Sequence, residues 1–448
     1  MRAAAAWILD RTLASRAPVD TFLEGPLERF EPRDRGLLVE LVLGSLRWLR
    51  RLDAILAEAS DREIDAIDAP LRAPLRIAAY QLLFLDRVPA HAAVNEAVEH
   101  AQRLTHRGGA SFVNAVLRRI ARSPRLGAWP VRESDPVRRL AIELSHPDFL
   151  VERWLERFGP DRTRAVLQAG NRPKPVHLLA FSDRGGRELL AESLIDEGLE
   201  VDPSSLSPMG LVVRSGDVFD TESFRRGDVY VQDEASQAAA LIPPPRPGEL
   251  ILDAAAAPGG KTFALLAREP TVRLVACDAD PARLGRLLGN LRRLRRRLPS
   301  AVADIGEPPF DPRPGGARFD RVVLDLPCTG TGTFRKHPEL KWRISEAEIG
   351  RLARRALRML SGGAPLVAEG GRLVAITCSL EAEENEDVVA RFLEDHPDFR
   401  LEPSLGELLQ PPLSGALRGE GLIRIFPGND HDGFSIHVLR REAARTPC

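Results

Sequence analysis

Two cysteines stand where apolar segments end, and a thiol in that position can do chemistry. Cys328 follows the segment 321–327, and Cys378 follows the segment 371–377. Such segments are typical of parallel strands buried on both faces, and open α/β sheets bind ligands just beyond the carboxyl ends of their strands. If the two segments are neighbouring strands, both thiols face one pocket. Most free cysteines are small buried hydrophobic residues, but positions just past the apolar runs favour chemistry.

Carboxylates end several other segments of the same kind. Asp253, Asp278, Asp304 and Asp325 each close a predicted strand, as Cys378 does. Because the carboxyl ends of parallel strands share one edge of a sheet, these groups should lie together. Their number predicts a polar ligand that lies across that edge.

The loop after Asp253 indicates the kind of ligand. It reads Ala-Ala-Ala-Ala-Pro-Gly-Gly-Lys-Thr and opens a helix whose free N–H groups suit a carboxylate. A triphosphate-binding loop would need Gly at position 255, where the chain has Ala, and Pro258 stiffens the segment. The dinucleotide motif GxGxxG is absent. Asp278 lies about 20 residues further on, where nucleoside-binding folds place a carboxylate on ribose. S-adenosylmethionine, an adenosine cofactor with a zwitterionic tail, fits these features.

A methyl donor beside two cysteines predicts methylation of a pyrimidine. Carbon 5 is a poor nucleophile until a thiolate adds to carbon 6, and the thiolate rather than the thiol is reactive. A free cysteine has a pKa of about 8.5, so the site must favour ionisation. A base must then remove the proton on carbon 5 before the thiolate can leave, and the second cysteine could serve.

Length and composition predict a protein of several domains without disulfides. At about 150 residues per domain, 448 residues predict three. The charge is balanced, with 63 basic and 64 acidic residues, so it does not point to a polyanionic partner. The four cysteines form no CxxC pair, which argues against a disulfide framework and a zinc site. No segment approaches the roughly 20 apolar residues of a membrane span, so we expect a soluble cytoplasmic protein.

Hydrophobic periodicity predicts the order of the elements. Residues 1 to about 125 have helical spacing, and 121–145 is predicted to be a linker. Two helices at 147–159 and 162–169 precede a small α+β module with strands at 176–181, 211–213 and 228–231 and a helix at 187–197. A strand–helix alternation begins at Glu249. We predict its strands at 249–253, 272–278, 299–303, 319–325, 371–377, 423–426 and 433–439, the last two antiparallel, and later helices at 345–360 and 385–395.

Several motifs together resemble one known family. They are Gln232-Asp-Glu-Ala-Ser-Gln237, Ala256-Ala-Pro-Gly-Gly-Lys-Thr262, Asp325-Leu-Pro-Cys-Thr-Gly-Thr-Gly332, Arg335-Lys-His-Pro-Glu-Leu-Lys-Trp342, Thr377-Cys-Ser379, Asn385 and Asp432-Gly-Phe434. These motifs resemble those of the NOL/NOP/Sun family of RNA cytosine-5 methyltransferases. The stretches 76–83, 88–95 and 112–118 are similar to the NusB-type RNA-binding domain. That pairing resembles the Sun/Fmu type, bacterial methyltransferases of the small-subunit ribosomal RNA.

The resemblance implies a fold and a reaction. It implies an all-α NusB-like bundle at 1–128, a small α+β connecting and RNA-binding module at 145–228, and a Rossmann-like methyltransferase domain at 229–442. The implied reaction moves a methyl group from S-adenosylmethionine to carbon 5 of a cytosine in 16S ribosomal RNA, with cytosine 967 as the target. A cytoplasmic monomer is expected. The same chemistry on transfer RNA, and an RNA-binding assembly or antitermination factor with a vestigial catalytic domain, are the alternatives.

The resemblance also implies the roles of individual residues. Cys378 is the nucleophile, Cys328 helps to release the product, and Asp325 contacts the base and the methionine end of the cofactor. Asp278 holds the ribose and Asp304 the adenine, and no metal takes part. The residues that cradle the cofactor are Ala255, Ala256, Ala257, Pro258, Gly259, Gly260 and Lys261, although Lys261 can equally be a structural ion-pair partner.

Two departures from the family and two charged segments leave questions for the structure. The family's first loop usually has a cysteine where this chain has alanines, and its Leu-Arg-x-Asn appears here as Leu178-Leu-Ala-Phe181. The acidic run 381–387 is predicted to form the first turn of a helix. Segment 283–297 carries seven arginines and no acid, and its arginine face is expected to be solvated, with RNA phosphates as the alternative. Its predicted core stripe is Leu284, Leu287, Leu288, Leu291, Leu294 and Leu298.

Overall fold

The protein, described from a computed structural model, folds as two compact units. The structure describes residues 1–105, 107–307 and 318–442. Unit 1 holds Met1–Pro173 together with Phe334–Arg343, and unit 2 holds Lys174–Thr333 and the chain from Ile344 onward. The chain therefore enters unit 1 a second time, from within the part predicted to be catalytic.

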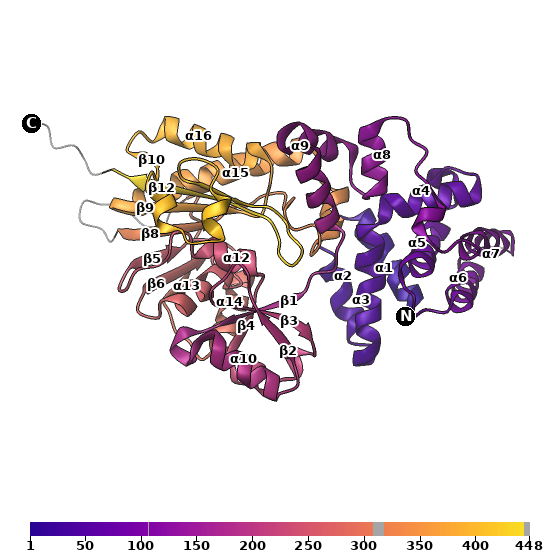
Figure 1. Ribbon diagram of the computed structural model, residues 1–448, viewed down its shortest axis with the longest axis horizontal. Helices are drawn as coiled ribbons and strands as arrows, with labels where there is room; N and C mark the ends of the chain where they lie inside the picture. The colour runs from indigo at the N-terminus through magenta and orange to yellow at the C-terminus, as the bar shows by residue number, and fades with distance from the viewer. Residues whose placement is uncertain (106, 308–317, 443–448) are drawn as a thin grey trace, which may run out of the picture. The chain divides into compact units, whose positions relative to one another are not determined.

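Unit 1 is helical, as the periodicity predicts (Figure 1). In the fifth helix, for example, Leu75, Ala78 and Ala79 have the three- and four-residue spacing of one helical face, and all three are buried. The helices are α1 (Arg2–Ala14), α2 (Asp20–Leu27), α3 (Pro32–Arg47), α4 (Leu49–Ser60), α5 (Ala69–Phe84), α6 (Ala90–Leu104), α7 (Arg107–Ala121), α8 (Pro136–Glu143) and α9 (Asp148–Gly170). Helix α9 bends at Gly159, where φ is 73°, so its two arms are the two helices predicted for 147–169.

The prediction of a linker over 121–145 is wrong for its second half, which contains α8. Asp135 is the N-cap of this helix, because its carboxylate accepts from the backbone N–H of Arg138 at 2.8 Å. Pro136 occupies the first helical position, where its missing N–H has no cost. The dipeptide Asp135-Pro136 is thus the start of a helix. Leu140 and Ala141 are buried, so α8 is part of the packed unit.

Residues 334–343 are held inside unit 1 by a buried lysine. Lys341 donates to Asn171 Oδ1 at 2.6 Å and to the backbone carbonyls of Arg47 and Ser145 at 3.2 and 3.3 Å. The Arg47 guanidinium donates in turn to the carbonyl of Arg335. Within the described residues, none of the hydrogen-bond partners of Lys341 is a carboxylate, and burial lowers its pKa well below the usual value. Deleting the N-terminal helices would therefore remove the surroundings of this segment.

The stability of unit 1 is expected to rise with pH because of Lys341. Its pKa is lower in the folded state than in the unfolded chain, so between these two values the unfolded chain binds more protons, and raising the pH stabilises the fold. All five tryptophans (positions 7, 48, 129, 154 and 342) lie in unit 1, so urea unfolding followed by tryptophan fluorescence reports on this unit alone. Lys341→Met should lower the free energy of unfolding of unit 1 by about 2–4 kcal/mol, because it leaves buried hydrogen-bond acceptors unpaired. It should also lose the increase between pH 7 and pH 9; a variant that keeps that increase would contradict the assignment.

Unit 2 begins with a small antiparallel sheet in the order β2-β3-β1-β4. Its strands are β1 (Val176–Ala180), β2 (Glu200–Pro203), β3 (Gly210–Ser215) and β4 (Val229–Val231), with helices α10 (Gly186–Asp196) and α11 (Glu222–Arg226). The predicted strands are confirmed, whereas β2 was not predicted. The four residues that replace the family's polar motif, 178–181, are all buried. That stretch therefore packs here.

The larger part of unit 2 is an eight-stranded sheet with helices on both faces (Figure 1). The path is β10-β12-β9-β8-β5-β6-β7, and β11 pairs with β12. The neighbours from β9 to β7 are parallel, whereas β12 is antiparallel to β9, β10 and β11. The strands are β5 (Leu250–Asp253), β6 (Arg273–Asp278), β7 (Ser300–Val302), β8 (Phe319–Asp325), β9 (Val367–Thr377), β10 (Phe399–Leu401), β11 (Leu422–Ile425) and β12 (Phe434–Arg441).

The helices of this domain form two groups, each packed in its own hydrophobic core on one face of the sheet. Residues of α12 (Glu234–Ala240), α13 (Gly260–Arg268) and α14 (Pro281–Arg293) pack on one face of the sheet. Those of α15 (Glu346–Gly363) and α16 (Glu386–Asp395) pack on the other. The predicted strands agree with the observed ones within a few residues, and the last two are antiparallel as predicted. Helix α12, the short helix α17 (Leu405–Leu408) and strand β10 were not predicted. Across the described ranges, no helix is long and apolar enough to cross a membrane.

Candidate active site

Strands β8 and β9 bring the two cysteines together. They pair in parallel, with Asp325 opposite Ile376, so both thiols follow the same edge of the sheet. Cys328 Sγ and Cys378 Sγ are 3.5 Å apart, and both cysteines are free and partly buried. The hydrogen bond to Cys378, followed by burial, raises the pKa of Cys328 well above its usual value. Cys328 therefore keeps its proton at neutral pH.

The backbone around the cysteines is fixed by close contacts. The N–H of Leu326 donates to the carbonyl of Ile376 at 2.8 Å, and the N–H of Gly332 donates to the carbonyl of Cys378 at 2.9 Å. A Cβ on Gly332 would lie 2.5 Å from the carbonyl oxygen of Gly433, so only glycine allows this approach. The loop after Cys328 is thus tied to the residue that it faces.

An ion pair lies beside the thiols. Lys261, in the first turn of α13, places its Nζ 2.6 Å from Asp325 Oδ2. Burial acts to lower the pKa of Lys261, but Asp325, Cys378 and Asp253 outweigh it, and the pKa is raised. The structure thus places Lys261 in an ion pair and also near the Cys378 sulfur. The ammonium is the positive charge that a thiolate at Cys378 would need.

The loop between β5 and α13 has the features of a cofactor cradle. No side chain caps the N-terminus of α13, so its first N–H groups are available to an anionic group. Gly259 has a φ of 119°, and a Cβ there would lie 2.2 Å from the Phe263 ring. Below it, Thr262 donates to Asp253 Oδ2 at 2.6 Å, and burial raises the pKa of Asp253 to about 6.

Asp278 contacts this loop, whereas Asp304 follows β7, the strand next to β6 in the sheet. Asp278 is 3% exposed and accepts from the N–H groups of Ala257 at 3.2 Å and Asp280 at 3.0 Å. A carboxylate has about four acceptor positions, so two bonds leave capacity for ribose hydroxyls. Asp304 is exposed two residues beyond the end of β7, where it accepts from Gly306 at 2.9 Å. The predicted strand 299–303 is shorter than expected.

Comparison with known proteins identifies the family. Three family models match: NusB over residues 1–122, an RsmF/B-like ferredoxin-like domain over 146–218, and the 16S rRNA methyltransferase RsmB/F over 240–440. The chain is 35% identical to the ribosomal RNA small subunit methyltransferase B of Pseudomonas syringae pv. tomato, covering 99% of this chain and 97% of that one. The chain belongs to the RsmB/F methyltransferase family.

Further relatives agree with this membership. The probable ribosomal RNA small subunit methyltransferase B of Bacillus subtilis is 33% identical to this chain. The match covers 92% of this chain and 91% of that protein. Among solved structures, that of PH0851 has a TM-score of 0.77 at 27% identity, with 98% of each chain covered. A methyltransferase homologue from Pyrococcus horikoshii has a TM-score of 0.56 at 26% identity and covers 69% of this chain and 100% of its own. The predicted fold class is confirmed.

In this RsmB/F family member, Glu384 is a site residue that the sequence analysis missed. The acidic run 381–387 does form helical turns, a 3₁₀ turn at Ala382–Glu384 and then the first turn of α16 from Glu386. Glu384 differs from a solvated first-turn carboxylate because it is 1% exposed. Its carboxylate accepts from the N–H of Thr329 at 2.8 Å and from the Thr329 hydroxyl at 2.6 Å. Thr329 directly follows Cys328. The signal available in the sequence was the position of Glu384, six residues after Cys378.

Protonation of Glu384 should make the fold of unit 2 sensitive to pH. Burial raises the pKa of Glu384 to about 7 from the 4.5 of a free glutamate, so the folded state binds more protons between these values. The stability contributed by this group is present below about pH 4.5 and is lost as the pH rises through 7. The free energy of unfolding of Glu384→Gln, measured relative to that of the original protein, should therefore increase by about 2–3 kcal/mol from pH 5 to pH 8. Calorimetric unfolding at both pH values measures this, and an equal difference at both would show that the carboxylate does not titrate.

Asn385 and its neighbours hold the Cys378 segment from the other side. Thr377 Oγ1 donates to Asn385 Oδ1 at 2.6 Å, and the Asn385 amide donates to the carbonyls of Ser379 at 3.2 Å and Glu381 at 2.7 Å. The hydroxyl of Ser435 in β12 also donates to the Ser379 carbonyl, at 2.9 Å. The antiparallel strand β12 thus supports the segment that carries Cys378.

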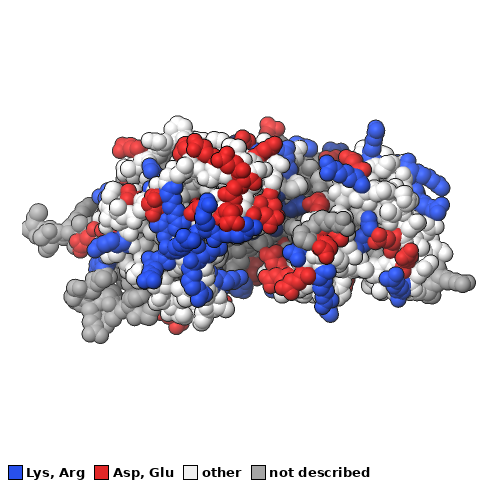
Figure 2. All heavy atoms as spheres, turned by 90° about the horizontal axis from the view of Figure 1, so that it is seen from below, with Lys and Arg blue, Asp and Glu red and all other residues white. Residues whose placement is uncertain are grey.

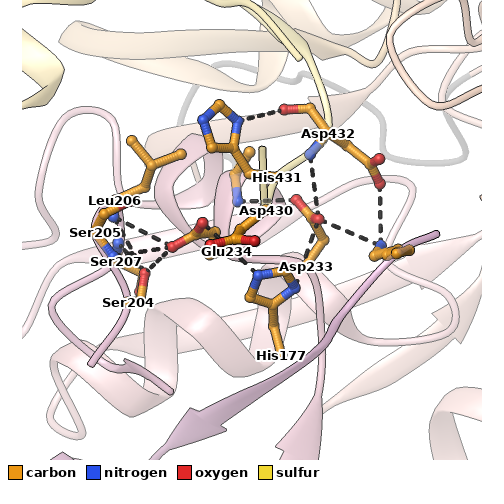
Figure 3. Close-up of polar contacts among 12 residues, drawn as sticks. His177, Ser204, Ser205, Leu206, Ser207, Asp233, Glu234, Asp430, His431 and Asp432 are labelled. Atoms are coloured by element: carbon orange, nitrogen blue, oxygen red, sulfur yellow. Dashed lines mark hydrogen bonds and ion pairs between the residues drawn. The ribbon is translucent and has the colours of Figure 1, made fainter. Parts of the chain in front are cut away.

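A buried charged cluster joins the small module to the catalytic domain of unit 2 (Figure 3). Lys174 Nζ lies 3.0 Å from Asp432 Oδ2 and 3.3 Å from Asp233 Oδ2. His177 lies between Asp233 and Glu234, at 3.9 and 3.7 Å, and burial lowers its pKa. Gly433, which follows Asp432 in the chain, donates its N–H to the carbonyl of Gly332 at 2.8 Å. The cluster is therefore connected through Gly433 and this hydrogen bond to the loop that follows Cys328.

Proposed function

We propose that this protein methylates carbon 5 of a cytosine in 16S ribosomal RNA, with S-adenosylmethionine as the methyl donor and cytosine 967 as the target. The pair of thiols 3.5 Å apart at the ends of two adjacent parallel strands, beside a buried lysine, is the observation that supports the proposal most strongly. Membership in the RsmB/F family supports the substrate.

The cofactor loop fits the proposed methyl donor by its chemistry. The uncapped N-terminus of α13 suits the carboxylate of the methionine tail, and the carboxylate of Asp278 suits ribose hydroxyls. Residues 255–261 would line the cradle, Asp304 would hold the adenine, and Asp325 would contact the methionine end. When bound, the cofactor supplies an electrophilic methyl group. All the other steps belong to side chains of this protein and to the base.

The two thiols divide the reaction between them. Cys378 attacks carbon 6 as a thiolate, which makes carbon 5 nucleophilic, and Lys261 provides the compensating charge. Asp325, held by Lys261 and partly exposed, contacts the base. When Cys378 is bonded to carbon 6, the contact that most raises the pKa of Cys328 is lost, so Cys328 can release its proton to solvent. After methyl transfer, the Cys328 thiolate takes the proton from carbon 5, and the electrons of that C–H bond restore the ring double bond as the bond from carbon 6 to Cys378 breaks and Cys378 departs as a thiolate. Cys328, within hydrogen-bond distance of Cys378, assists this release.

Binding of the methyl donor is expected to depend on Asp278. Asp278→Ala removes the ribose acceptor and also the bonds to the loop at Ala257 and Asp280. A charged hydrogen bond contributes about 1.5–3 kcal/mol, so the Kd for S-adenosylmethionine should rise about 10- to 100-fold. Isothermal titration calorimetry measures this, with ATP as the control ligand. Binding of ATP in place of the methyl donor would contradict the proposed cofactor.

Methylation of 16S ribosomal RNA itself is tested in cells. Bisulfite mapping of cellular RNA, with and without the gene, should show one cytosine in 16S ribosomal RNA that loses its methyl group. Loss at a transfer RNA position instead would favour the alternative substrate. No change at any cytosine would favour a binding factor without activity.

A further inference from the structure

We propose that the solvent face of α14 binds the phosphate backbone of a duplex segment of the substrate RNA, outside the active site. Arg286 and Arg292 lie on α14, and Arg295 and Arg297 lie in the segment that follows its last residue, Arg293; the four together are here called the α14 arginine strip. This inference rests on the proposed function, because it names where the same RNA is held beyond its target base.

The seven arginines of this segment fall into two groups. Arg293 packs over the Phe224 ring at 4.3 Å and donates to the carbonyls of Phe224 and Val229, and Arg296 forms two bonds with Asp183. Arg283 donates to the carbonyl of Ala257. These three side chains attach α14 to the small module and to the cofactor loop. Structural roles therefore account for them.

The four arginines of the strip have no such role. Arg286, Arg292, Arg295 and Arg297 are exposed, and within the described residues none has a hydrogen-bond or ion-pair partner. No acidic residue lies between positions 281 and 299. Figure 2, which views unit 2 from the side of α10, shows basic side chains gathered on this face. Unneutralised positive charge of this kind attracts phosphates through release of their counterions.

Two glycines leave part of this face of α14 without projecting side chains. Gly285 and Gly289 lie inside α14, four residues apart, and a Cβ at either position would meet no atom within 4 Å. Packing within the protein therefore does not require glycine, although each costs the helix about 0.5–1 kcal/mol relative to alanine. Glycine does permit close approach of another backbone. Together with the arginines, this geometry points to an RNA strand that lies against the helix.

The strip suits a duplex better than a single strand. Binding of single strands uses aromatic side chains for stacking, and positions 281–299 contain none. A helix of 13 residues is about 20 Å long, which matches about six phosphates along one strand of a duplex. The core leucines keep the helix in place, since Leu284, Leu287, Leu291 and Leu294 are buried; the prediction that Leu288 belongs to this stripe is wrong, because Leu288 is 42% exposed.

The test replaces the four strip arginines by glutamine and measures RNA binding against salt. The Kd for a 16S fragment that contains the target should rise about 100-fold at low salt, and the slope of log K against log salt should fall by about three to four. The Kd for S-adenosylmethionine and kcat at saturating RNA should be unchanged. A matched control replaces four exposed arginines of α15, Arg351, Arg354, Arg355 and Arg358, in the same way and should change the Kd less than threefold.

A second variant tests the geometry with the charge intact. Gly285→Leu with Gly289→Leu keeps every arginine and should weaken RNA binding about tenfold by holding the strand away from the helix. Unchanged affinity and salt slope in the arginine variant, or an equal loss in the α15 control, would overturn the proposal. These outcomes are distinct from failure of the proposed function, which would appear as absence of RNA methylation by the unaltered protein.

Discussion

Cys328→Ser is expected to trap the substrate RNA on the protein, whereas Cys378→Ser is expected to abolish methylation and leave no adduct. A serine hydroxyl is barely ionised at neutral pH, so serine at 378 cannot attack carbon 6. With serine at 328, Cys378 can still attack carbon 6, and the bound base can still be methylated. The variant lacks the thiol that lies 3.5 Å from the sulfur that must depart. The two variants therefore differ in the species that accumulates.

Denaturing gels with labelled RNA and S-adenosylmethionine measure the difference. Cys328→Ser should give a protein–RNA band that survives denaturant and disappears on RNase treatment. An adduct with Cys378→Ser and none with Cys328→Ser would reverse the two roles. Cys277 provides a matched control, because it is a buried cysteine of β6 in the same sheet whose pKa burial raises to about 12. Cys277→Ser should trap no RNA.

Lys261→Met is expected to slow formation of the covalent adduct about 10²- to 10³-fold. The positive charge of Lys261 interacts with Cys378, and this interaction is reciprocal, so the ammonium favours the thiolate. Loss of one preorganised electrostatic partner in an active site typically costs a factor of this size. The stability loss should be small in comparison, since the Asp325 side chain is 37% exposed and solvent screens its charge.

Adduct formation in a Cys328→Ser background isolates this step, and a pH series identifies its cause. The rate with Lys261→Met should recover partly as the pH rises, because hydroxide then supplies the thiolate that the ammonium no longer favours. A loss of the same size at every pH would show that Lys261 acts only by positioning Asp325. Thermal unfolding of the variant distinguishes either result from simple loss of the fold.

The sequence by itself determined most of the elements and the edge of the sheet at which the proposed active site lies. Apolar segments followed by Asp253, Asp278, Asp325 and Cys378 are local signals, since a buried parallel strand must be apolar and must end in a turn. The parallel order of β9, β8, β5 and β6 then places those residues at one edge. The family's short motifs added the roles, because each motif combines a strand end with the residues that follow it.

Only the tertiary structure decided which charged residues are buried and which residues they interact with. Glu383 and Glu384 are adjacent in one acidic run, yet Glu384 is buried and bonds to Thr329, 55 positions away, whereas Glu383 is only half-buried. Lys341 follows the catalytic loop in sequence but is buried among helices of unit 1. The seven arginines of segment 283–297 look equivalent in sequence, although within the part of the chain that the structure describes three form hydrogen bonds and four form none. Burial and pairing depend on contacts between distant parts of the chain, which local periodicity does not encode.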